Sequence, residues 1–236
     1  LSAGGYPFTG SSVASYQAST AHRITFSNNI IAESLSAGGG YGTLIEDNVT
    51  DILLYGNLWA HNQERSPNFG GGTRGAVINN VIYNPGGKFL DYTFANWKWD
   101  GEGNGLRSTG KLTAIGNVGL AGPSTNAVAF FVTVSNGDVD YFGQDNIAKR
   151  VDGSSYPATL QSPYLSNPQG QIVMKDAPPA SPPGVRAAAS STVLETVSAS
   201  VGARPWDRDA NDARILNELK TGTGRIIHTE ADVGGY

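Results

Sequence analysis

Five asparagines recur at the corners between short apolar runs, and this recurrence limits the possible folds more strongly than any other feature. They are Asn29, Asn57, Asn80, Asn117 and Asn146, each preceded by β-forming residues and followed by an apolar or small residue. The intervals between them are 28, 23, 37 and 29 residues. Repeats of roughly 20–50 residues indicate stacked structural units, with insertions placed as loops on one face. Asparagine tolerates the left-handed backbone of a sharp bend, and stacked amides can bond to the units above and below.

The recurrent motif keeps one phase, and the turn signals typical of β-hairpins are scarce. We therefore expect an all-β fold, a parallel β-helix built of stacked coils. The alternative is a β-sandwich with asparagines in its turns. The abundant glycine, 31 residues, and the low charged fraction of 15% fit many tight bends and few exposed helices.

Composition also limits the partners and the organisation of the chain. The formal net charge of −4, with no basic run, argues against nucleic acid, and the chain has no cysteine for disulfides or thiolate metal sites. No apolar stretch approaches the roughly 18 residues of a membrane span. We expect a monomer whose residues 1–175 form β-helix coils. Because the sequence begins in the middle of a pattern, an N-terminal portion of the β-helix is expected to be missing from it.

The pattern changes after the coils. Residues 176–184 contain four prolines and are expected to be a linker, which leads into a C-terminal tail ending at residue 236. Residues 191–200 fit a strand or a short helix. Residues 205–220 predict a helix, with acidic residues in its first turn and Gly222 at its end. We expect residues 176–236 to pack on or near the coils and to cover an open edge.

Three passages resemble the pectate lyase family of polysaccharide lyases. They read RITFSNNIIAESL, TDILLYGNLWAHNQERSPNF and RGAVINNVIYNPG, and the closing passage from Gly202 to Gly235 is similar to the tail of bacterial members. The resemblance implies a right-handed parallel β-helix and a secreted enzyme, extracellular or periplasmic. It also implies cleavage of polygalacturonate (pectate) by β-elimination with calcium, most of whose expected ligands lie upstream of Arg23.

The chemistry of elimination indicates what the site requires. Removal of the C5 proton of a 1,4-linked uronate needs a base near that carbon and positive charge on the neighbouring carboxylate. The family's Arg-x-Pro element matches Arg65-Ser66-Pro67, which would make Arg65 the base. A free guanidinium has a pKa above about 12, so an arginine base requires burial or neighbouring cations to lower it. An alkaline activity optimum is the expected consequence. The alternative for Arg65 is a solvated loop cation paired with Glu64.

The remaining candidates are less firmly tied to the family pattern. Arg74 is the nearest match for a second family arginine, because position 70 is glycine. His61 lies near Arg65 in the sequence and is a candidate sugar contact. Trp97 and Trp99 could stack on pyranose rings. Glu33 is a candidate metal or sugar ligand, or else a loop carboxylate. The loop SLSAGGGYG has no counterpart of the family's substrate-binding lysine.

Three functions stay open from the sequence. The first is a lyase acting on an acidic polysaccharide, polygalacturonate or a related uronan. The second is a glycoside hydrolase on the same fold, which would need clustered carboxylates. The third is a β-helix that binds polysaccharide without catalysis, which the missing lysine and Gly70 favour.

Overall fold

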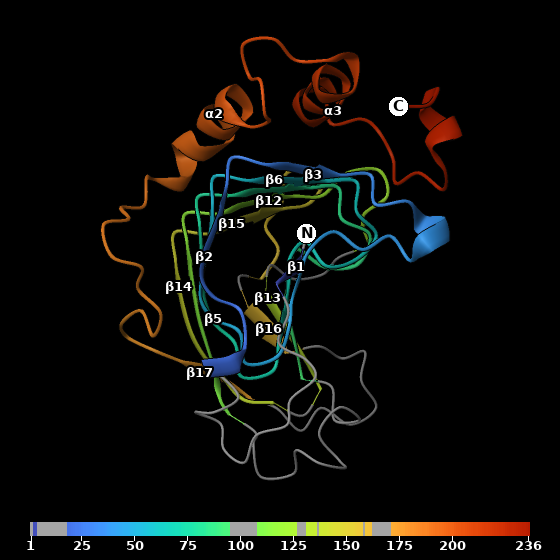
Figure 1. Ribbon diagram of the computed structural model, residues 1–236. Helices are drawn as coiled ribbons and strands as arrows, with labels where there is room; N and C mark the ends of the chain where they lie inside the picture. Colours follow the sequence, from blue (N-terminus) through green and yellow to red (C-terminus); the bar gives the residue numbers. More distant parts are fainter. Residues whose placement is uncertain are drawn as a thin grey trace.

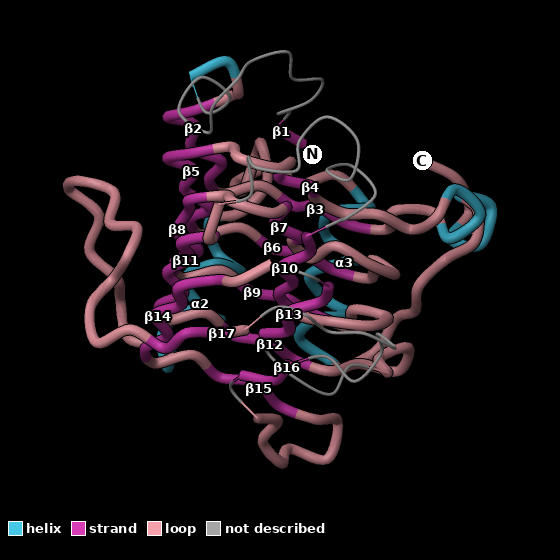
Figure 2. The backbone as a smooth tube through the Cα atoms, turned by 90° about the horizontal axis from the view of Figure 1, so that it is seen from below, coloured by secondary structure: helices cyan, strands magenta, loops and turns pink. Residues whose placement is uncertain are grey.

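Three parallel sheets of short strands form the framework of the described chain. The computed structural model describes residues 2–3, 18–94, 108–126, 131–135, 137–157, 159–161 and 171–236. Successive strands from β2 onward enter sheets B, C and A in turn, so each sheet gains one strand per repeat. Every pairing between neighbouring strands of these sheets is parallel. Figure 2 shows the strands stacked in this order along the molecule.

The strands are short, and most of the longer ones belong to sheet B. Sheet A contains β1 (Ser2–Ala3), β4 (Leu44–Ile45), β7 (Asn68–Gly70), β10 (Leu90–Phe94), β13 (Phe131–Ser135) and β16 (Thr159–Gln161). Sheet B contains β2 (His22–Ser27), β5 (Thr50–Tyr55), β8 (Arg74–Ile78), β11 (Gly110–Ile115), β14 (Val139–Gln144) and β17 (Ile172–Met174). Sheet C contains β3 (Ile30–Ala32), β6 (Leu58–Ala60), β9 (Val81–Tyr83), β12 (Val118–Leu120) and β15 (Ile147–Lys149).

The parallel pairing confirms the coarser part of the sequence prediction, an all-β core of parallel sheets. It excludes the β-sandwich for the described residues, because sandwich sheets are antiparallel. The helices are few: among the described residues they include α2 (Ser190–Ser200) and α3 (Ala210–Thr221), with 3₁₀ turns at η1 (Ser36–Gly38) and η3 (Glu230–Val233).

The predicted asparagine stack is confirmed at the corner between sheets B and C. Asn57 donates to Asn80 Oδ1 from its backbone N (2.8 Å) and from its side-chain Nδ2 (3.0 Å). The same two bonds join Asn29 to Asn57, Asn80 to Asn117, and Asn117 to Asn146. This ladder therefore ties five successive repeats together through one amide in each, buried in the three inner repeats and partly exposed in the two outer ones.

The bend itself differs from the prediction. The left-handed residue is the one before each ladder asparagine, not the asparagine itself. These residues are Asn28, Gly56, Asn79, Gly116 and Asp145, with φ between 52° and 66°. Glycine, asparagine and aspartate are the residues that adopt this region at least cost. At each corner, one residue therefore makes the bend and the next residue makes the ladder hydrogen bonds.

Two apolar layers explain why the sheet C strands are almost entirely apolar, with Lys149 at the end of β15 as the polar exception. Trp59 of β6 points between the sheets, is fully buried, and donates from Nε1 to Thr43 Oγ1 at 2.8 Å. Its neighbours Leu58 and Ala60 point the other way and pack against α2 and α3. Alternate residues of a strand face opposite sides, so a sheet covered on both faces needs apolar residues at every position.

The C-terminal segment covers sheet C, as Figure 1 shows for α2 and α3. The helix predicted at 205–220 begins later, at Ala210, because the side chain of Asp209 caps it by accepting from Asp212 N. Gly222 ends it in the left-handed conformation, as predicted. Residues 191–200, left open between strand and helix, lie in α2. Among the described residues, none of the helices has the length and apolar character of a membrane span.

Candidate functional site around Arg65

The loop from β6 to β7 is fixed by the loops of the repeats on either side. Glu64 N donates to Gly40 O (3.0 Å), and Thr43 N donates to Arg65 O (2.7 Å). On the other side, Gly87 N donates to Gln63 O (3.1 Å). A loop whose backbone is bonded along both edges has little freedom to move. The side chain of Arg65 is therefore presented from a rigid support.

Arg65 has φ of 62° and lies at the molecular surface with its side chain partly exposed. Its guanidinium stacks on the ring of Tyr41, with 3.8 Å between the guanidinium carbon and the ring centroid. Tyr41 is itself 52% exposed. Within the part of the chain that the structure describes, Arg65 forms no ion pair, so the expected alternative of an Arg65–Glu64 pair is not seen.

Glu64 of this loop lies near a lysine and a second carboxyl group, Lys88 and Asp91, which come from the next repeat. Burial raises the pKa of Glu64, while the charges of Lys88 and Arg65 oppose that rise. Lys88 Nζ lies 3.0 Å from Asp91 Oδ2. Asp91 is fully buried, which raises its pKa, and among the described residues its Oδ1 has no hydrogen-bond partner. Asn68 Nδ2 also donates to Asp91 Oδ2 at 3.1 Å.

Sequence reasoning missed Tyr41, Lys88 and Asp91. The many aromatic residues among polar ones in 84–104 suggest one long loop, but strand β10 begins at Leu90 and pairs with β7 and β13. The run LDYTF alternates apolar and polar residues strictly, so it carries a strand signal of its own that was overlooked. The repeat length is a second signal, because the interval of 23 residues from Asn57 to Asn80 also separates Asn68 from Asp91.

Arg74 and Arg65 lie on different sheets and do not form one site. Arg74 begins β8 in sheet B, whereas Arg65 precedes β7 in sheet A. Its guanidinium is bound by Asp51, with Nη2 and Nε at 2.8 Å and 3.0 Å from Oδ1. Both side chains are about two-fifths exposed. The expectation that Arg74 serves the Arg65 site is therefore corrected, because a whole strand of sheet A separates the two arginines.

His61 is covered by the C-terminal segment and offers no contact to a sugar. The residue is 0% exposed. Asn84 Nδ2 is 2.8 Å from His61 Nδ1, and Glu218 Oε2 of α3 is 3.0 Å from His61 Nε2. The contact between His61 Nε2 and Glu218 Oε2 is short but poorly aligned for a hydrogen bond, so it is mainly electrostatic. Burial lowers the pKa of His61, and the charges of Glu218 and Glu33 only partly oppose this.

Glu33 is likewise held by the C-terminal segment. Arg214 of α3 donates to both of its carboxylate oxygens, from Nη1 at 2.7 Å and from Nη2 at 2.8 Å. Tyr236 Oη donates to Oε2 at 3.3 Å, and the Glu33 side chain is 2% exposed. The expected role as a metal or sugar ligand is thus corrected. The hydrogen bonds to Glu33 hold the pKa of Arg214 above its usual value.

Among the described residues, no three Asp, Glu, His or Cys side chains cluster closely enough to hold a metal ion. Trp97 and Trp99, the predicted stacking residues, lie outside the described residues.

No protein-family model matches the sequence. No curated protein matches it either.

Proposed function

We propose that this chain is a polysaccharide lyase that cleaves polygalacturonate or a related uronan by β-elimination, with Arg65 as the base. The observation that carries the proposal is the state of Arg65, which is fixed through its backbone, partly exposed, and without an ion pair among the described residues. A cation kept for structure is normally paired when its loop is ordered. This one is held in place, stacks on Tyr41, and pairs with no carboxylate among the described residues.

A neutral guanidine of Arg65 takes the C5 proton, the C5–H electron pair forms the C4–C5 double bond, and the C4–O4 glycosidic bond breaks. The leaving oxygen takes a proton from water, and Arg65 later returns its proton to water. The C5 proton is acidic because the adjacent carboxylate accepts the developing charge, so a second cation near that carboxylate would help. Lys88 of the next repeat is the candidate for this role, and it would have to exchange its ion pair with Asp91 for the substrate carboxylate.

A second candidate is a β-helix that binds acidic polysaccharide without cleaving it. The stacking of Arg65 on Tyr41 favours this alternative, because a cation–π contact stabilises the charged guanidinium and not the neutral base. A glycoside hydrolase is less well supported. Of the two carboxyl groups near Arg65, Asp91 is fully buried and bound to Lys88, so it is not available to a sugar.

The proposal includes the setting of the site. The regular succession of sheets B, C and A supports a right-handed parallel β-helix, with residues 176–236 as its covering segment. We further propose that the protein is secreted and acts as a monomer. Calcium enters only as a variable to be tested, since the described residues offer no cluster for it.

The test is elimination by the purified chain, followed as ultraviolet absorbance of the unsaturated product. Polygalacturonate is supplied with and without calcium across an alkaline pH range. Arg65→Ala and Arg65→Lys should lower the rate at least about 100-fold, the usual contribution of a positioned acid or base. Arg204→Ala, which removes an exposed and ion-paired arginine, is the matched control and should keep the rate.

The outcomes separate the candidates. Reducing ends without absorbance would mean a hydrolase, and binding without either product would mean a non-catalytic protein. If Arg65→Ala also lowered the thermal midpoint by several degrees, its loss of activity would be assigned to folding. Normal elimination by a stable Arg65→Ala protein would remove Arg65 from the mechanism.

A further inference from the structure

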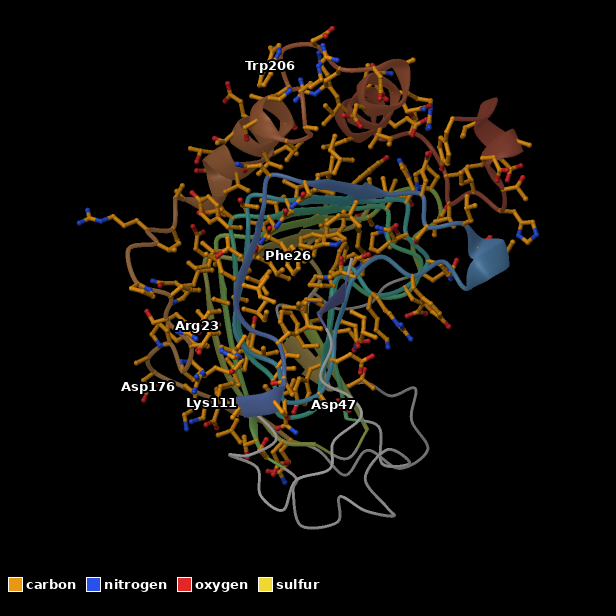
Figure 3. The ribbon with its side chains drawn as sticks, viewed as in Figure 1. Arg23, Phe26, Asp47, Lys111, Asp176 and Trp206 are labelled. Carbon is orange, nitrogen blue, oxygen red and sulfur yellow. The ribbon has the colours of Figure 1, made fainter. Side chains whose placement is uncertain are left out.

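A second groove lies on the outer face of sheet B, away from Arg65. It encloses about 800 Å³ between the strands β2, β5 and β8 and the proline-rich segment that leads to α2. Its lining includes Arg23, Asp51, Arg74, Pro179, Pro183 and Val185. Figure 3 labels Arg23 and Asp176 on this outer side, whereas Phe26 of the same strand as Arg23 lies between the sheets. The predicted linker therefore forms one wall of a groove.

The proline-rich wall is fixed at both ends. Ala180 N donates to Thr113 Oγ1 of β11 at 3.2 Å. Farther along, Ala188 N donates to Asn79 Oδ1 at 2.7 Å, and Asn79 Nδ2 donates to Ala188 O at 2.8 Å. Between these points, Val185 packs on the outward-facing apolar residues of sheet B. Prolines further restrict the backbone. The groove is thus already formed before any ligand enters, which reduces the entropy cost of binding.

Cations outnumber carboxylates in the groove. Two guanidinium groups, of Arg23 and Arg74, face one carboxylate, of Asp51. Asp51 binds Arg74, while the contact made by Arg23 is with the ring of His22 at 3.2 Å. The Arg74–Asp51 pair is about two-fifths exposed on both sides, and such pairs contribute at most about 1 kcal/mol. A ligand carboxylate could therefore replace Asp51 at little cost.

The spacing of these cations follows the stack. Strand β5 lies between β2 and β8, so Arg23 and Arg74 are two strand separations apart, roughly 10 Å. Lys111 is in register with Arg74 on β11 and is exposed, which extends the row of positive charge beyond the groove by roughly 5 Å. A row of cations along the stack matches a linear ligand that carries negative charges at intervals.

We propose that this groove binds a linear, carboxylate-bearing oligosaccharide along the stack, as a holding site separate from the cleavage site. One carboxylate contacts Arg23 and another contacts Arg74, while the proline, valine and alanine side chains pack against the C–H faces of the sugar rings. The choice of an acidic glycan rests on the proposed function. The position of the groove and its charge do not.

The test uses the Nε–Hε resonances of the arginines in nuclear magnetic resonance spectra of the full chain. An Arg65→Ala background prevents cleavage, and oligogalacturonate is the probe. Neutral galactan oligomers and sodium citrate, at equal carboxylate concentration, are the comparisons. Oligogalacturonate should shift the Arg23 and Arg74 resonances and leave that of Arg204 unchanged. Neutral galactan and citrate should shift neither.

Three charge-removing variants sharpen the result without straining the backbone. Arg23 and Asp51 both have left-handed φ, of 55° and 57°, which asparagine tolerates. Arg23→Asn and Arg74→Gln should each weaken binding about 5- to 10-fold, the effect of one lost charged contact. Asp51→Asn frees Arg74 and should strengthen binding about threefold.

The proposal is overturned if oligogalacturonate shifts neither arginine, if citrate shifts both equally, or if Asp51→Asn weakens binding. Its failure is distinct from failure of the lyase proposal. If the unsubstituted chain eliminates normally but the Arg65→Ala protein shows no shifts, the groove alone is lost. If the Arg65→Ala protein shows the shifts but the unsubstituted chain produces no unsaturated product, the groove is kept and the catalytic assignment is lost.

Discussion

Replacement of Asn80 by alanine tests whether the ladder carries the stability of the stack. The Asn80 side chain is completely buried and accepts two bonds from Asn57. It also donates to the carbonyl oxygens of Leu54 and Ile78 and to Asn117 Oδ1. Asn80→Ala therefore removes bonds to the repeats on both sides at once.

The magnitude follows from the groups left behind. The buried backbone N–H of Asn57 loses its acceptor, and one unsatisfied buried group costs about 1–3 kcal/mol. The Leu54 carbonyl loses a donor as well, whereas the Ile78 carbonyl still accepts from Gly56 N at 3.2 Å. The total is about 3 kcal/mol. For a domain of this size that corresponds to a fall of about 10 °C in the thermal midpoint.

The assay is urea unfolding followed by far-ultraviolet circular dichroism, with Asn29→Ala as the matched control. Asn29 lies at the end of the ladder, and within the described structure its side-chain oxygen accepts no bond. Its removal leaves no buried donor unsatisfied and should cost about 1 kcal/mol or less. Equal unfolding midpoints for the two variants would refute the reasoning, because the position within the ladder would then not matter.

Three further predictions concern the covering segment and the packing between sheets. Because burial lowers the pKa of His61, the unfolded chain takes up the proton first, so stability should fall as pH drops below about 6.5. His61→Gln should flatten that part of the stability curve measured by urea unfolding. Arg214→Ala leaves the buried Glu33 carboxylate uncompensated and should cost about 2–3 kcal/mol, less than for a fully buried pair because Arg214 is 25% exposed. Adding Glu33→Gln should recover part of the loss, and hydrogen exchange of α3 would report it. Gly110→Ala would place a Cβ 2.5 Å from the buried ring of Tyr92 and should cost about 1–3 kcal/mol, measured as a lower thermal midpoint.

The repeats were predictable from sequence because their cause is local. A corner needs a residue such as Gly56 or Asn79 that adopts the left-handed backbone conformation, followed by an asparagine whose amide bonds to the neighbouring repeats. Both residue types can be read directly from the sequence. The position of Arg65 after β6 followed from the same logic. The alternation of LDYTF also indicates strand β10, whereas its pairing with β7 and β13 follows only from the stacking of the repeats.

The assignments of Glu33 and His61 failed for a different reason. Glu33 lies in the loop after β3, where a sequence pattern indicates an exposed ligand. Its partner Arg214 is 181 residues away along the chain. Local patterns contain no information on where a C-terminal segment folds back. Arg74 was placed in the wrong site because nine residues along this chain cross a complete strand of sheet A.

The ladder also separates what must stay constant from what is free to vary. Its rungs are 23 to 37 residues apart in sequence, yet they are joined by the same pair of bonds. Closing the longer of these intervals instead of the shorter one costs only about 0.4 kcal/mol in chain entropy. Loops between rungs can therefore lengthen, shorten or be exchanged for new sequences while the stack persists. The stacked core can therefore stay the same while the recognition surfaces formed by its loops are replaced one at a time.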